Sequence, residues 1–251
     1  MTSRSSANFA VGARVERLPL ILHVLDRTYG RSSHARGGDP LDSLIATVLS
    51  QNTTDTNSHR AFEQLKERFP SWDDVLRARP ARIARAIRSG GLGGIKSKRI
   101  RQILREIERE RGRLDLNFLK GKSLAGSRDY LTSLPGVGPK TAACVLLFSL
   151  GKPAFPVDTH VLRVSKRLGL LLRKTTMEQA HDVFMELLDS PGPSGGEAKW
   201  DADDMLALHL GLVRHGREVC RARRPMCSVC ALDELCPRVG LSDSMARRMR
   251  E

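Results

Sequence analysis

Four cysteines near the end of the sequence constrain this chain more than any other feature. Cys220, Cys227, Cys230 and Cys236 follow the spacing C-x6-C-x2-C-x5-C, which places four thiols within 17 residues. Intracellular proteins rarely use disulfides, so such a cluster calls for a metal. Because the segment is short, its thiolates can surround one metal centre without ligands from the rest of the chain.

The spacing of the thiols also bears on which metal they would bind. Zinc held by four cysteines is common, but zinc ribbons and knuckles carry two close pairs with a longer span between them. Here one close pair, Cys227 and Cys230, has a single cysteine on either side, which favours a [4Fe–4S] cluster over zinc. The loop after the first cysteine holds Arg221, Arg223 and Arg224, which we expect to clamp phosphate groups, with a merely solvated basic loop as the alternative.

The charge of the chain indicates a polyanionic partner. It has 42 Lys and Arg against 28 Asp and Glu, a formal net charge of +14. Nucleic acid and an anionic membrane are the two candidates. The basic residues are spread along the chain, and no apolar run reaches the length of about 20 residues that spans a bilayer, so nucleic acid is favoured. We therefore expect no membrane association and a cytoplasmic, nucleoid-associated protein.

Apolar residues recur at helical spacing throughout, and no segment alternates with the period of a strand, so the expected fold is all-α. Asp39 and Pro40 read as an N-cap and first helical residue. Gly90–Gly94 is expected to be a flexible loop that exposes Leu92, and Cys144 is expected to be a core residue. The expected helices cover residues 18–25, 40–49, 58–69, 73–78, 80–89, 100–107, 127–134, 139–150, 159–170, 176–188 and 201–215.

The string L-P-G-V-G-P-K-T-A at residues 134–142 lies between two expected helices. Its two glycines allow a tight turn and a close approach to another molecule, and Pro139 starts the second helix. The free N–H groups of this turn suit a phosphate and would position a backbone without reading bases. We expect DNA contacts at Gly136, Val137, Gly138 and Thr141. A plain helix–turn–helix connection is the alternative, and the glycine pattern of a phosphate-loop NTPase is missing.

Two titratable residues near this turn could carry chemistry. Lys140 lies in the first turn of its helix, where the helix dipole should lower its pKa and favour the neutral amine that a nucleophile requires. A lysine that only contacts phosphate is the simpler alternative. Asp158 opens a later helix and can serve as its N-cap, as a carboxylate that accepts the proton of the lysine, or as both. His160 is expected to have a structural role.

These motifs, in this order and separation, resemble the endonuclease III family of DNA glycosylases over residues 18–236. The resemblance rests on Leu49-Ser50, Thr54-Asp55, Gly91-Leu92, Leu134–Ala142, Val157–His160 and the four cysteines. It implies two lobes: a six-helix barrel with a helix-hairpin-helix at residues 34–152, and an iron–sulfur lobe formed by residues 1–33 and 153–251.

The resemblance also implies a function, a bifunctional glycosylase and AP lyase for oxidised pyrimidines in base excision repair. Lys140 would attack the sugar C1′ of a flipped-out nucleotide, a Schiff base would form and β-elimination would nick the strand. Asp158 would assist, a [4Fe–4S] cluster would be bound, and Asn52 and Leu92 would fill the gap in the stack. The expected partner is double-stranded DNA containing damaged bases or abasic sites, bound by a monomer.

The sequence departs from the family pattern at three places. Asn52 stands where the family usually has Gln, Gly93-Gly94 follow Leu92 where bulkier polar residues are usual, and Ser190–Gly196 is an added loop. Two other functions remain as alternatives. One is a monofunctional mismatch or adenine-type glycosylase, against which Lys140 argues because that group has Ser or Tyr there. The other is a non-catalytic protein that binds damaged DNA.

Overall fold

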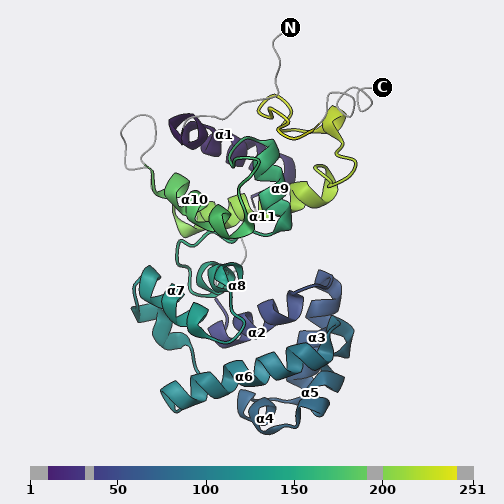
Figure 1. Cartoon of the computed structure of the whole chain (residues 1–251), viewed down its shortest axis with the longest axis vertical. Coiled ribbons are helices and arrows are strands. Elements are labelled where there is room, and N and C mark those ends of the chain that lie inside the picture. Colours follow the sequence, from purple (N-terminus) through teal and green to yellow (C-terminus); the bar gives the residue numbers. More distant parts are fainter. Residues whose placement is uncertain (1–10, 32–36, 191–199, 242–251) are drawn as a thin grey trace. The chain divides into compact units, whose positions relative to one another are not determined.

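The computed structural model describes residues 11–31, 37–190 and 200–241 of this chain. Within these ranges it contains helices and turns and no strand, which confirms the all-α expectation (Figure 1). All but the first residue of the Ser190–Gly196 loop lies outside the described residues. Among the described helices, none is both long enough and apolar enough to cross a membrane.

The chain divides into two compact units. Arg36–Lys152 form one, which we call the hairpin unit, and Met1–Ala35 with Pro153–Glu251 form the other, which we call the cysteine unit. The hairpin unit is therefore one continuous stretch of the chain, and the cysteine unit is made of the two segments that flank it. The bounds of the hairpin unit differ by two residues at one end from the expected 34–152.

The hairpin unit is built around α2, which buries six of its 11 residues, and the longer amphipathic helix α6. Asp39 caps α2 by accepting the N–H groups of Leu41 and Asp42 at 2.8 and 3.0 Å. In Figure 1, α7 lies at the left of this unit and α3 with α5 at the right. The elements are α2 (Pro40–Ser50), α3 (Asp55–Arg68), α4 (Trp72–Arg77), α5 (Pro80–Ala86), η1 (Arg88–Gly90), α6 (Gly93–Arg111), η2 (Asn117–Gly121), α7 (Leu124–Ser133), α8 (Pro139–Cys144) and the π turn η3 (Val145–Ser149).

Two local expectations about this unit were wrong. Gly93 and Gly94 begin α6, so the expected loop Gly90–Gly94 is reduced to Gly91 and Leu92. The helix expected at residues 139–150 is α-helical only to Cys144 and then widens into η3. That segment is buried nearly throughout, as expected, and its packing overrides the propensity for a regular helix.

The cysteine unit consists of α1 (Val11–Tyr29), α9 (Thr159–Arg167), α10 (Met177–Asp189), α11 (Ala202–Glu218) and the short turn η4 (Cys227–Val229). Two glycines let neighbouring helices approach α11 closely. An added Cβ on Gly211 would lie 3.0 Å from the Leu25 side chain of α1, and one on Gly216 would lie 2.9 Å from the His160 Cβ of α9. Larger residues at these two positions would push α1 and α9 away.

Candidate functional site

The turn between α7 and α8 adopts the tight conformation that its glycines predict. Gly136 has a φ of 71°, which favours glycine, and a Cβ there would lie 2.5 Å from Arg99 Nε, so the Arg99 side chain would have to shift. Val137 is buried and donates its N–H to the Leu134 carbonyl at 3.1 Å. Gly138 precedes Pro139 without a side-chain cap, so the amide groups of the first turn of α8 have no capping side chain.

Gln51 joins this turn to the loop that follows α2. Its Nε2 donates to Thr141 Oγ1 at 3.4 Å, and its Oε1 accepts from Arg99 Nη1 at 2.9 Å. The buried Thr141 belongs to α8 and Arg99 to α6, so one amide connects three elements. Gln51 and Arg99 give no signal of this role in the sequence, because each is defined only by its partners in space.

Asn52 and Leu92 share a left-handed backbone conformation, which asparagine tolerates and which strains leucine. Their φ angles are 54° and 48°, and Arg238 is the one other non-glycine residue in the described ranges with a positive φ. A bulky residue such as Leu pays about 1–2 kcal/mol in this region. Leu92 nevertheless exposes 50% of its surface. An exposed apolar side chain on a strained turn indicates selection for something other than stability.

Lys96 holds both of these loops from inside. It is 3% exposed, and its Nζ donates to the carbonyls of Leu49 at 2.7 Å and Gly90 at 2.8 Å. Leu49 lies near the end of α2, before Asn52, and Gly90 ends η1, before Leu92. Burial lowers the pKa of Lys96. Gly93, the residue after Leu92, lets the backbone of this loop approach α5 closely. An added Cβ on Gly93 would lie 2.9 Å from the Ala84 carbonyl oxygen.

Lys140 and Asp158 occupy the helix starts that the sequence predicted. Lys140 is a partly exposed residue in the first turn of α8 in the hairpin unit. Asp158 is the N-cap of α9 in the cysteine unit, and its Oδ1 accepts the N–H of Val161 at 2.7 Å. His160 contacts Arg163 Nη2 through its Nδ1 at 3.2 Å and packs against α11. These contacts give His160 a structural role.

The four cysteines of the C-terminal motif line a single cavity. Cys220, Cys227, Cys230 and Cys236 surround it, together with apolar side chains from α9 and the loop, and the free space between them is small, about 20 Å³. Burial raises the pKa of Cys230 to about 11 and that of Cys236 to about 12. Within the described ranges, no group of three or more His, Cys, Asp or Glu is placed to hold a single metal ion. Cys144, in contrast, is buried in α8 of the other unit.

Arginine side chains from α9 donate hydrogen bonds to the loop that carries the four cysteines, which has little regular secondary structure. Arg167 donates to Cys220 Sγ at 3.2 Å and to the carbonyls of Arg221 and Ala222 at 2.8 and 2.9 Å. Arg163 Nε donates to the Cys220 carbonyl at 3.1 Å. His215, which is 2% exposed, lies with its Nε2 3.5 Å from Cys230 Sγ.

The sequence analysis missed Arg163, Arg167 and His215, because helical arginines and histidines give no sequence signal for such contacts. Arg221, Arg223 and Arg224 are exposed, as a phosphate clamp requires. The guanidinium of Arg221 also donates to the Glu218 carbonyl at 3.1 Å.

Comparisons with known proteins agree on one family. The sequence profile of the HhH-GPD superfamily of base excision DNA repair proteins matches residues 45–190. Endonuclease III of Sulfolobus acidocaldarius is 34% identical over 197 residues, which cover 77% of this chain and 80% of that protein. An inferred DNA glycosylase of Arabidopsis thaliana is 39% identical over 203 residues, or 81% of this chain and 66% of that protein, just under two thirds.

Solved structures show the same likeness. A trapped covalent intermediate of endonuclease III with DNA superposes with a TM-score of 0.71 at 27% identity, covering 94% of this chain and 99% of that one. A non-covalent complex of endonuclease III with DNA gives a TM-score of 0.72 at the same identity.

Proposed function

Because this chain belongs to the endonuclease III family of helix-hairpin-helix base excision DNA repair proteins, we propose that it is a bifunctional glycosylase and AP lyase for oxidised pyrimidines in duplex DNA. The observation that carries this proposal is the position of Lys140. It is an amine at the start of α8, one residue before Thr141, through which Gln51 links the turn to the loop that carries Asn52.

In the proposed mechanism Lys140 is the nucleophile. Its neutral Nζ attacks the sugar C1′, the N-glycosidic bond breaks, and the base departs with the bonding electron pair and takes up a proton. The sugar opens to a Schiff base. Loss of a C2′ proton then expels the 3′ phosphate by β-elimination. That endonuclease III itself has been trapped as a covalent intermediate with DNA supports this route.

We assign two tasks to Asp158 in this mechanism. Its carboxylate would accept the proton that Lys140 Nζ loses and would stabilise positive charge on the opening sugar. As N-cap of α9, Asp158 holds its carboxylate in place through the Val161 N–H at 2.7 Å, which fixes the negative charge that the second task requires.

DNA contacts in this proposal come from both units. The amides of Gly136, Val137 and Gly138, with Thr141, would bind one backbone, and Asn52 and Leu92 would fill the gap left by the flipped nucleotide. The Arg221–Arg224 loop would contact phosphate.

The four cysteines fit a [4Fe–4S] cluster. Four thiols around one cavity form the donor set that such a cluster uses, and apolar neighbours with few other acceptors surround them. Cys220, Cys227, Cys230 and Cys236 would be its ligands. When bound, the cluster would fix the loop that presents Arg221, Arg223 and Arg224; the residues of the chain carry the reaction. Absorption in the visible range would distinguish this cluster from zinc, which is colourless.

The experiment that tests the proposed function is borohydride trapping. The purified protein is incubated with an end-labelled duplex that carries one abasic site, borohydride is added, and the products are separated on a denaturing gel. We expect a covalent protein–DNA band that disappears in Lys140→Ala, with duplex affinity retained. Lys122→Ala, on an exposed lysine just before α7, serves as the matched control and should keep the band.

Three results would contradict the proposal. A Lys140→Ala variant that still forms the covalent band would refute the assigned nucleophile. Base release without strand scission by the natural chain would indicate a monofunctional glycosylase. Binding of the abasic duplex with no turnover on any lesion would indicate a damage-binding protein without catalysis.

A further inference from the structure

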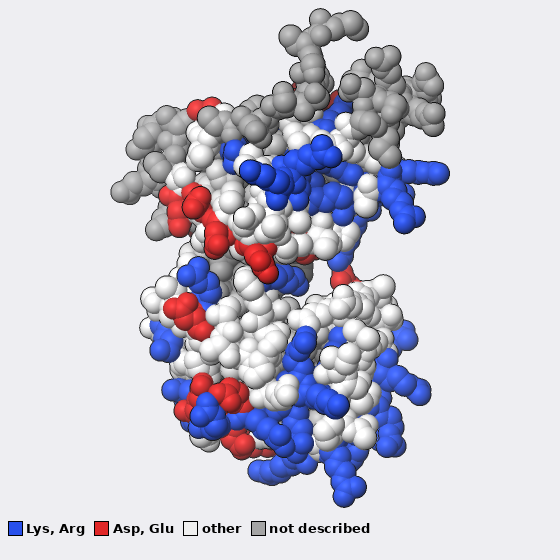
Figure 2. All heavy atoms as spheres, viewed as in Figure 1, with Lys and Arg blue, Asp and Glu red and all other residues white. Residues whose placement is uncertain are grey.

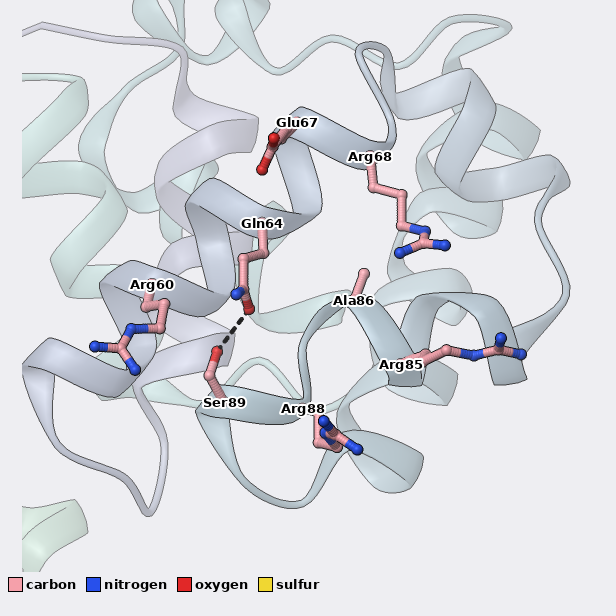
Figure 3. A pocket seen from close by; sticks show the side chains of 8 residues that line it. All are labelled: Arg60, Gln64, Glu67, Arg68, Arg85, Ala86, Arg88 and Ser89. Atoms are coloured by element: carbon pink, nitrogen blue, oxygen red, sulfur yellow. Dashed lines mark hydrogen bonds between the residues drawn. The ribbon is translucent and has the colours of Figure 1, made fainter.

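An open groove in the hairpin unit lies outside the site described above. It runs between α3 on one side and α5 with η1 on the other, and its volume is about 670 Å³ (Figure 3). Four arginines line it: Arg60 and Arg68 from α3, and Arg85 and Arg88 from α5 and η1. The two sides are joined at the base of the groove, because Ser89 Oγ donates to Gln64 Oε1 at 3.0 Å and Gly90 packs against Ala61.

The groove concentrates positive charge that the described residues do not neutralise. All four guanidinium groups are exposed, and Glu67 is the one carboxylate in its lining. No ion pair within the described ranges joins any of the four arginines to an acidic side chain. Figure 2 shows Lys and Arg gathered over the right side of this unit. Such a groove should attract an anion.

The arginines are spaced for an extended anion. Arg60 and Arg68 lie eight residues apart on α3, which corresponds to roughly 12 Å along the helix. In Figure 3, Arg60 lies toward Ser89 at one end, and Arg68 and Arg85 lie toward the other end. This span equals the rise of about three to four base pairs, so the groove can follow a sugar–phosphate backbone over several nucleotides.

The elements that line the groove are close in sequence to the two loops that carry Asn52 and Leu92. Asn52 is three residues before α3 starts, and Arg88 is four residues before Leu92. The α7–α8 turn is joined through Gln51 to the end of α2, directly before Asn52. The elements that line the groove and the turn therefore both adjoin the loops that carry Asn52 and Leu92, which the proposed function places against the duplex.

From this arrangement we propose that the arginine groove binds the phosphate backbone of the undamaged DNA strand beside the lesion. The inference rests on the proposed function and adds to it the way in which the second strand is held. An acidic peptide is the competing occupant. Such a partner would need an apolar anchor for affinity, and Ala86 is the one apolar side chain in the lining, so a phosphodiester backbone is favoured.

The test compares two double variants of the full-length protein that lose the same charge. Arg60→Gln/Arg88→Gln alters the groove, and Arg105→Gln/Arg109→Gln removes two exposed arginines of α6 outside it. Binding to a duplex with a stable abasic-site analogue is measured by fluorescence anisotropy at several salt concentrations, so no turnover is required. We expect the groove variant to bind roughly tenfold more weakly and its slope of log K against log salt to fall by about 1.8.

A second measurement identifies the strand. Neutral methylphosphonates replace single phosphates in one strand at a time. A methylphosphonate on the undamaged strand, at a phosphate that the groove contacts, should weaken binding of the natural chain. It should have little further effect on the groove variant, because both changes remove the same contact. The α6 variant should respond to that substitution as the natural chain does.

Either of two results would overturn the inference. One is a groove variant with the affinity and salt slope of the α6 control, which would leave the groove to a peptide or other anion. The other is non-additivity confined to methylphosphonates in the lesion strand. Failure of the proposed function looks different, because the natural chain itself would then form no borohydride-trapped band.

Discussion

The hairpin unit and the end of the cysteine unit hold their candidate sites by opposite means. In the hairpin unit, Lys96 and Gln51 tie two loops and a turn together with the unit's own hydrogen bonds. In the cysteine unit, residues 219–241 form one short 3₁₀ turn, η4, and a series of hydrogen-bonded turns, and side chains from outside the loop, such as Arg167, donate to it as well. The first site is complete in the protein alone, whereas the second encloses buried thiols that suit a bound cluster.

Because of this difference, we expect the two sites to respond differently to amino-acid substitutions. A hydrogen-bonded loop that loses one partner weakens locally, by the cost of one unsatisfied group. When a loop organised around a metal loses one ligand, the remaining thiols no longer hold the metal centre. All the ligand bonds are then lost together. Substitutions of matched size in the two units can therefore test the comparison, beginning with the cluster ligands.

The largest expected effect is that of Cys236→Ala. Structural metal sites contribute on the order of 10 kcal/mol to folding, so loss of a ligand should release the metal and loosen residues 219–241. We expect visible absorption and iron content to be lost, and amide hydrogen exchange to accelerate in that segment while α2 and α6 stay protected. Cys144→Ala is the matched control, since Cys144 is buried in α8 and should leave the iron bound. Equal iron content in the two variants would contradict the ligand assignment.

The second effect is smaller and lies in the hairpin unit. Lys96→Met removes the donor from the Leu49 and Gly90 carbonyls, which should lower the free energy of unfolding by about 2 kcal/mol. Because the loops that carry Asn52 and Leu92 lose their anchor, affinity for an abasic-site duplex should fall as well. Urea denaturation and anisotropy measure the two quantities. Lys98→Met, on an exposed lysine two residues further along α6, should change neither. If both variants lost the same stability, Lys96 would not be the anchor.

The sequence predicted the parts of the two sites that are contiguous in the chain and did not predict the contacts between distant residues. The turn at residues 134–142 and the cap at Asp158 are contiguous signals, and each of them predicted a local structure that is present. The cysteine spacing is a contiguous signal as well, and the four thiols line one cavity, while their binding of a metal stays a prediction. Gln51, Lys96 and Arg167 gave no such signal, because their partners are carbonyls and side chains far along the chain. Gly93 begins α6 although its sequence context predicts a loop, and its closeness to the Ala84 carbonyl, where an added Cβ would lie 2.9 Å from the oxygen, is visible only in space.

The smallest expected effect concerns Leu92, and it runs in the opposite direction. Leu92→Asn places a residue that tolerates the left-handed conformation at a φ of 48°, which should raise the free energy of unfolding by up to about 1 kcal/mol. Loss of the exposed apolar side chain should at the same time slow base excision. Ile95→Asn is the control: Ile95 is 59% exposed but lies in ordinary helix, so its replacement relieves no strain. Thermal melting and single-turnover excision separate the two effects. A Leu92→Asn variant that melts below the Ile95→Asn variant would mean that the leucine supports the loop, and that the hairpin unit does not trade stability for an apolar wedge.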